Sequence, residues 1–76
     1  MLKQVNIICN NILEYNHFCE CLEWNLSKQN KRYKRVRESM VDIDKQIKYV
    51  YVRTHGYKPD GNEEIWMCNK LIGEKL

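Results

Sequence analysis

The sequence has no alanine, and it has only 3 glycines and 1 proline among its 76 residues. Residues 1–55 contain neither glycine nor proline, the two strongest breakers of regular structure, so long regular elements are expected there. The glycines lie far apart, at positions 56, 61 and 73, which excludes a glycine-rich loop that cradles a phosphate. The absence of alanine beside abundant Asn, Lys and Ile is typical of an AT-rich genome, such as that of a low-GC bacterium, its phages or a virus.

The sequence also lacks a long apolar run. No segment approaches the ~18 consecutive apolar residues of a membrane span, and the N-terminal residues lack the apolar region of a signal peptide. We therefore predict a cytoplasmic protein that does not contact a membrane. In that compartment the 4 cysteines are expected to be reduced thiols rather than disulfides.

Motifs for metal binding and catalysis are missing as well. Cys19 and Cys21 form a C-x-C pair instead of the C-x-x-C pair of zinc sites, and on a helix they would point about 200° apart. The other potential metal ligands are scattered along the chain: Cys9, His17, His55 and Cys68. Nucleophilic and acid–base chemistry have no local signature either, so we predict no metal, no cofactor and no enzymatic activity.

A chain of this length forms one small domain, here residues 1–76, and its 43% hydrophobic residues suffice for a folded core. Apolar residues of the first two thirds recur every three or four positions, which predicts helices. The stripes consist of Val5, Ile8, Ile12, Tyr15, Cys19, Leu22 and Leu26, and then of Tyr33, Val36, Met40, Ile43 and Ile47.

The first stripe predicts a helix from Lys3 to Trp24, and Ser27 is expected to cap a second helix. One alternative makes Gln4–Cys9 a short strand and begins the helix near Asn11. The other is a single unbroken helix over residues 3–50 that forms a coiled-coil homodimer.

The C-terminal third predicts a β-hairpin between Tyr49–Val52 and Ile65–Cys68, two runs rich in β-branched and aromatic residues. The sequence Lys58-Pro59-Asp60-Gly61 has the composition of a type I turn followed by a glycine bulge. In this register Val50, Val52, Trp66 and Cys68 face the helices, and Tyr49, Tyr51 and Arg53 lie on the other side. The predicted fold class is therefore α+β, with two helices followed by a C-terminal β-hairpin (ααββ) in a small single domain.

Positive charge is concentrated between residues 28 and 37, where 6 of the 13 basic residues occur without a carboxylate. Such clusters are typical of surfaces that bind phosphates or an acidic protein, although a solvated helix start is the alternative. The predicted partner-binding residues of this stretch are Lys28, Lys31, Arg32, Tyr33, Lys34, Arg35 and Arg37.

A second predicted contact surface consists of Tyr49, Tyr51 and Arg53 on the hairpin. Tyr and Arg are enriched in interface hot spots, and aromatic rings on an open sheet stack on unpaired bases. The alternative is that another element covers this surface. Trp24 lies opposite the first helical stripe, so we expect it to be exposed and to contact a partner.

These features predict a small non-enzymatic protein that binds another macromolecule, a protein or nucleoprotein, and inhibits or modulates it. An inhibitor of a host nucleoprotein, encoded by a phage or mobile element, would fit the composition. The alternative is a regulator that binds DNA or RNA directly through Lys28–Arg37. Only the alternative requires retention on heparin or DNA that falls steeply with salt.

Overall fold

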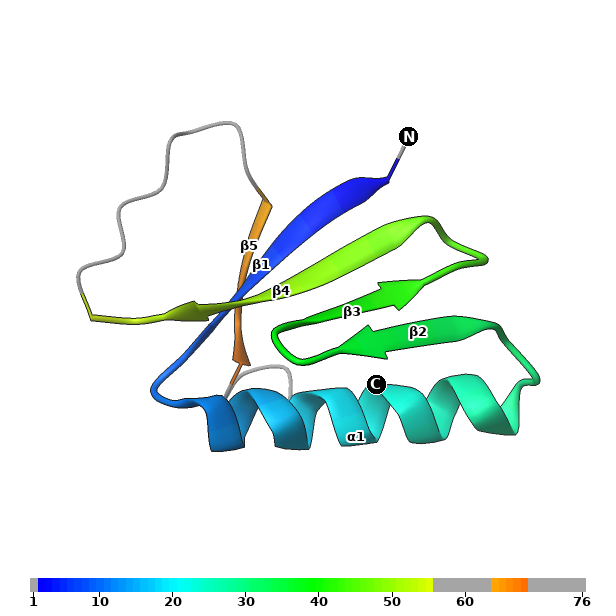
Figure 1. The fold of residues 1–76 in the computed structure, drawn as a ribbon, viewed down its shortest axis with the longest axis horizontal. Helices are drawn as coiled ribbons and strands as arrows, with labels where there is room; N and C mark the ends of the chain where they lie inside the picture. The colour runs from blue at the N-terminus through cyan, green and yellow to red at the C-terminus, as the bar shows by residue number, and fades with distance from the viewer. Residues whose placement is uncertain (1, 56–63, 69–76) are drawn as a thin grey trace.

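The computed structural model describes residues 2–55 and 64–68, which form one helix and a single five-stranded sheet (Figure 1). In the sheet the strand order is β2-β3-β4-β1-β5, and β1 is parallel to both of its neighbours, whereas β2, β3 and β4 are joined antiparallel. The fold is α+β, but its element order corrects the predicted ααββ arrangement. The elements are β1 (Lys3–Cys9), α1 (Ile12–Lys28), β2 (Tyr33–Val36), β3 (Ser39–Asp42), β4 (Ile47–Arg53) and β5 (Glu64–Met67).

The first segment is a strand, not the start of a helix. Val5, Ile7 and Cys9 alternate along β1 and are each at most 1% exposed, as expected for the core-facing side of a strand; Asn6, on the other side, is 3% exposed. Val5 and Ile8 fit a helical spacing as well, which is why the stripe was misleading. The alternative of a strand over Gln4–Cys9 and a helix from near Asn11 agrees with the structure.

The helix α1 begins where Asn11 caps it. The Asn11 side-chain oxygen accepts a hydrogen bond of 3.0 Å from the Glu14 N–H, and the Glu14 carboxylate accepts one of 2.9 Å from the Asn10 N–H. The helix continues to Lys28, so the predicted break near Ser27 is wrong. Beyond the helix, Asn30 adopts a φ of 56°, a conformation that Asn tolerates better than most residues.

Two antiparallel hairpins replace the predicted second helix, and neither contains glycine or proline. Between β3 and β4 the Asp42 carboxylate accepts a hydrogen bond of 3.0 Å from the Lys45 N–H, a turn built by a side chain. Gln46 then takes a φ of 56° to complete the reversal. The helical spacing of residues 33–47 therefore arises from strands and turns, and the unbroken helix over 3–50 is excluded as well.

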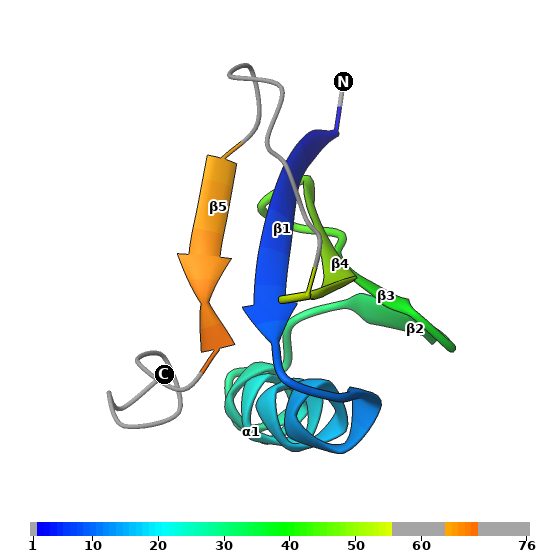
Figure 2. The same ribbon diagram turned by 90° about the vertical axis from the view of Figure 1, so that its left-hand side faces the viewer.

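The predicted pairing of the two C-terminal strands is wrong because β1 lies between them. Val5 pairs with Tyr49 of β4 on one side and with Glu64 of β5 on the other. Figure 2 shows β1 and β5 side by side, with both arrowheads pointing toward α1. The predicted turn at residues 58–61 lies outside the described residues.

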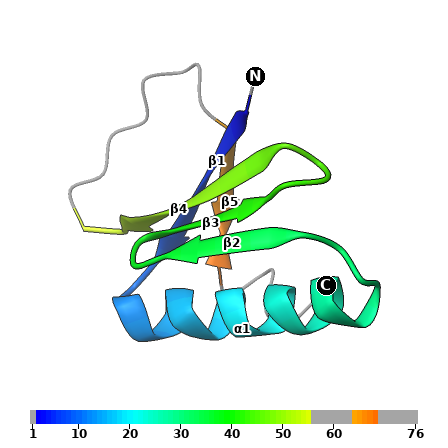
Figure 3. The same cartoon turned by 45° about the vertical axis from the view of Figure 1, so that its right-hand side comes forward.

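One face of the sheet packs against α1, which lies lengthwise beside β2 (Figure 3). The Tyr15 hydroxyl donates a hydrogen bond of 2.9 Å to the Tyr49 carbonyl, and the Phe18 and Tyr49 ring centroids are 5.7 Å apart. The buried cluster consists of Val5, Ile7, Cys9, Tyr15, Phe18, Cys19, Leu26, Met40, Tyr49 and Cys68.

The face assignment of β4 is the reverse of the predicted one. Tyr49 and Tyr51 point toward α1, while Val50 and Val52 point to the opposite face. On β5 the expectation holds, since Trp66 packs against the core and Cys68 is fully buried.

Candidate functional site

The basic stretch does not form one continuous surface. It covers the end of α1, a loop, strand β2 and the β2–β3 turn, and strand alternation sends its side chains to both faces of the sheet. Tyr33 and Arg35 lie on the side of α1, whereas Lys34 lies on the opposite side. A helix would have spread these residues around one cylinder, but the strand divides them between two faces.

Two of the arginines in this stretch are held by carboxylates. Arg32 binds Asp44 through its backbone N–H (2.7 Å) and its guanidinium (3.0 and 3.1 Å). These hydrogen bonds hold the pKa of the Asp44 carboxyl below its usual value. The Arg35 guanidinium bridges β2 to α1, with 3.2 Å to Glu23 and 2.7 Å to Asn16. Much of their charge is therefore satisfied within the protein.

Replacing Arg35 by alanine is expected to lower the free energy of unfolding by about 1 kcal/mol, because two hydrogen bonds to α1 are lost. Chemical denaturation followed by circular dichroism measures the change. Lys34→Ala is the matched control, since the neighbouring side chain has no ion pair with another described residue and should change stability little. Equal losses for both variants would contradict the bridging role of Arg35.

Trp24 lies where the sequence predicted it, on the exposed side of α1, with 63% of its surface accessible. The Lys28 ammonium is 4.6 Å from the centroid of its ring, so the two predicted site residues form a cation–π pair. Tyr33 also contacts the helix, with its hydroxyl 3.3 Å from that of Ser27.

The second predicted surface is largely internal. Tyr49 is only 5% exposed, and the ring of half-buried Tyr51 lies 5.5 Å from that of Tyr15 on α1. Burial, with the nearby carboxylates of Asp42 and Glu64, raises the pKa of Tyr49 to about 12. Arg53 at the end of β4 is exposed. The structure thus brings the two tyrosines together beneath the helix and leaves the arginine outside.

The sheet face opposite α1 was not identified from the sequence. Residues paired in register share a face, so the pairings place apolar, non-aromatic side chains from all five strands on this side. No described helix or strand covers them. Val36 is 53% exposed and Met67 is 47% exposed. We name this surface the aliphatic face; it consists of Ile8, Val36, Val41, Val50, Val52, Ile65 and Met67.

Free cations border the aliphatic face. Lys34 and Lys48 lie on it, and Arg37 lies in the adjoining β2–β3 turn. None of the three forms an ion pair with another described residue. An open hollow of about 470 Å³ lies here, lined by Val36, Arg37, Glu38, Ser39, Lys48 and Val50.

Cys19 and Cys21, the C-x-C pair of the sequence, have different environments. Cys19 is buried in the core, while the half-buried Cys21 lies 3.9 Å from the Nε2 atom of His17 one turn earlier. They do not face one position, as expected for neighbours on a helix. The prediction that all 4 thiols are reduced and metal-free stays a prediction.

Within the described part of the chain, no helix combines the length and apolar character that crossing a bilayer requires. The cytoplasmic location and the absence of enzymatic activity stay predictions. Comparison with known proteins finds no matching family model, no matching curated protein and no matching solved structure.

Proposed function

We propose that this protein is a small cytoplasmic binding module that docks its aliphatic face onto another protein and modulates or inhibits it by occupying that surface. The supporting observation is that five strands present apolar side chains on a face that no described element covers. Seven apolar side chains on this face have no second layer among the described elements, and two of them, Val36 and Met67, are about half exposed. Exposed apolar surface of this kind marks interaction sites. The phage or mobile-element origin remains a prediction from composition.

The chemistry of the aliphatic face favours a protein over a nucleic acid. Proteins that bind unpaired bases on a sheet present aromatic rings to them, but the described aromatic residues of the strands pack toward α1. Arg32 and Arg35, at the centre of the basic stretch, are already paired with carboxylates. Both observations weaken the alternative of direct DNA or RNA binding.

Charge further defines the partner. Lys34, Arg37 and Lys48 surround one end of the aliphatic face, and among the described residues that line the hollow Glu38 alone opposes them. Two copies joined through this face with their basic ends together would bring cations of one copy toward those of the other, which disfavours that arrangement. A partner with an apolar centre and acidic residues around it fits better than a second copy of the chain.

The proposal is tested by Val36→Glu, which places a carboxylate on the aliphatic face at a position that is 53% exposed. We expect about a tenfold or greater loss of affinity for the partner, because a charge would be desolvated in an apolar contact. Lys48→Glu should slow association and reverse its salt dependence. The partner is captured from a nuclease-treated extract of the source cells, purified, and its binding rates are measured with each variant.

Leu13→Glu is the matched control, since Leu13 is a 73% exposed aliphatic residue on α1, away from the aliphatic face. The proposal predicts binding like that of the parent for this variant. Equal losses for Val36→Glu and Leu13→Glu would contradict it. Capture that disappears with nuclease, with salt-sensitive retention on heparin, would favour the nucleic-acid alternative, and a concentration-dependent dimer disrupted by Val36→Glu would favour self-association.

A further inference from the structure

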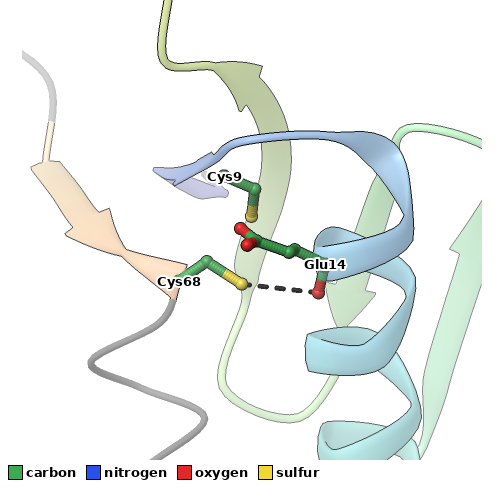
Figure 4. Close-up of side chains that lie close together, drawn as sticks. All are labelled: Cys9, Glu14 and Cys68. Atoms are coloured by element: carbon green, nitrogen blue, oxygen red, sulfur yellow. Dashed lines mark hydrogen bonds between the residues drawn. The ribbon is translucent and has the colours of Figure 1, made fainter.

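Three potential metal ligands from separate parts of the chain converge at the start of α1 (Figure 4). They are Cys9 at the end of β1, Glu14 in the first turn of α1, and Cys68 directly after β5. One ligand atom of each lies within 4.8 Å of the others. Cys9 is 1% exposed and Cys68 is 0% exposed, whereas Glu14 is half-buried and gives the cluster a side toward solvent.

The fold explains this convergence. The strands β1 and β5 are parallel neighbours in which Ile8 pairs with Met67, so the residues that follow leave the sheet at the same end. After β1 the chain enters α1 almost at once. The third residue of this helix is Glu14, whose side chain points back toward the helix start. Sequence reasoning missed the cluster because Cys9 and Cys68 lie at opposite ends of the chain.

In place of the predicted metal-free thiols, we propose that Cys9, Glu14 and Cys68 bind one zinc ion through two thiolates and a carboxylate, with water as the fourth ligand. Zinc accepts this combination of sulfur and oxygen ligands in a tetrahedron. With Zn–S bonds of about 2.3 Å, the two sulfurs would be about 3.8 Å apart, which is compatible with the present spacing. Thiolates disfavour Mg²⁺ and Ca²⁺, which prefer oxygen.

The carboxylate of Glu14 is already oriented. Its two oxygens accept hydrogen bonds of 2.9 Å from the Asn10 N–H and 3.1 Å from the Asn10 amide group. Each oxygen keeps a second lone pair for a metal. Such outer contacts fix the geometry of a ligand before the ion arrives.

The metal-free thiols hold their protons. Burial, together with their mutual contact, raises the pKa of Cys9, and burial also raises that of Cys68. The Cys68 thiol lies 3.4 Å from the Glu14 carbonyl, to which it donates a hydrogen bond. An ion must therefore displace two protons, and the apparent affinity should rise with pH. Since β5 pairs with β1 over four residues, the ion would also tether this edge strand to the helix.

The test is a titration of the full, reduced chain with Zn²⁺ and with Co²⁺ as a spectroscopic probe. We expect one equivalent of Zn²⁺ in native mass spectra, and for Co²⁺ a sulfur-to-metal charge-transfer band with the strong visible absorption of a tetrahedral site. Excess Mg²⁺ or Ca²⁺ should not compete. Bound Zn²⁺ should protect Cys9 and Cys68, but not Cys21, from alkylation, which peptide mapping detects without any substitution.

Glu14→Gln is the most informative variant, because glutamine can keep the hydrogen bond to Asn10 at the helix start but is a poor ligand. We expect an unchanged fold with at least about tenfold weaker binding. Cys9→Ser and Cys68→Ser should lose the charge-transfer band, and Cys21→Ser, the matched control outside the cluster, should retain it.

Several results would overturn the proposal. The first is that no complex with one equivalent of zinc forms. The second is that Cys21→Ser weakens zinc binding as much as Glu14→Gln does. The third is that zinc does not slow the alkylation of Cys9 and Cys68. A native mass two hydrogens lower, restored by Cys9→Ser, would show that the pair forms a disulfide instead. If a serine variant fails to fold, the alkylation map and Glu14→Gln still decide the outcome.

Discussion

Replacing Phe18 by alanine is expected to remove about 3–5 kcal/mol of stability, the loss that follows truncation of a fully buried aromatic side chain. Phe18 is 0% exposed, and its ring lies 6.2 Å from that of Tyr15 and 5.7 Å from that of Tyr49. A domain of 76 residues has a total stability of roughly 4–11 kcal/mol. The variant should therefore be largely or wholly unfolded well below the melting temperature of the parent protein, as circular dichroism and urea denaturation will show.

Leu13→Ala is the control for this experiment, because Leu13 belongs to the same helix but is 73% exposed. Its expected effect is within about 0.5 kcal/mol. If Phe18→Ala and Leu13→Ala had the same melting temperature, the face of α1 that packs on the sheet would be assigned wrongly. The pair of variants thus tests the helix orientation directly.

Alkaline pH is expected to unfold the protein through its buried thiols and phenols. Burial is the largest cause that raises the pKa of Cys9, Cys19 and Cys68 above 9.0 and that of Tyr15 and Tyr49 above 10.0. Well below pH 9 these groups are protonated in both states, and their contribution to stability does not change with pH. Above it, the unfolded chain loses protons first, so each group lowers the unfolding free energy by about 1.4 kcal/mol per pH unit until its folded pKa is reached.

The combined loss should reach several kcal/mol by about pH 11, which is comparable to the whole stability of the domain. Urea denaturation at a series of pH values, with a chelator present, measures it. Tyr49→Phe keeps the ring but removes one titrating group. Above pH 10 the unfolding free energy of this variant should therefore fall by about 1.4 kcal/mol per pH unit less than that of the parent protein. Identical slopes for parent and variant would mean that Tyr49 is not protected from ionisation.

The strand and helix at the start of the chain were within reach of sequence reasoning. Val5 and Ile8 fit both periods, and the alternative with a strand over Gln4–Cys9 and a helix from near Asn11 is the correct one; Asn11, which caps the helix, is the signal that could have decided between them. The two hairpins were less accessible. The β3–β4 turn depends on the Asp42 side chain and on Gln46 with a positive φ, and neither residue carries the strong signal of glycine or proline.

The orientation of the sheet could not be derived from β4 and β5 alone. Both faces of β4 carry good strand residues, and the assumed hairpin fixed a register that β1 prevents. The face of β4 that packs against α1 is decided by two aromatic residues of the helix, Tyr15 and Phe18, which contact Tyr49. The division of the basic stretch, and with it the position of Lys34 beside the aliphatic face, follows only once residues 33–36 are known to be a strand.

The central position of β1 has a consequence for the order in which the protein folds. This strand leaves the ribosome before its partners, yet β4 follows only after the helix, β2 and β3, and β5 comes later still. The hairpins involve neighbouring residues and can form early, whereas the parallel pairings close long loops at an entropic cost. Until β4 is synthesised, Val5 and Ile7 have no strand beside them, and a nascent chain therefore exposes an apolar, unpaired strand edge. Folding of this small sheet is therefore completed by the parallel pairings of β1 with β4 and β5, after the β2–β3–β4 side has formed.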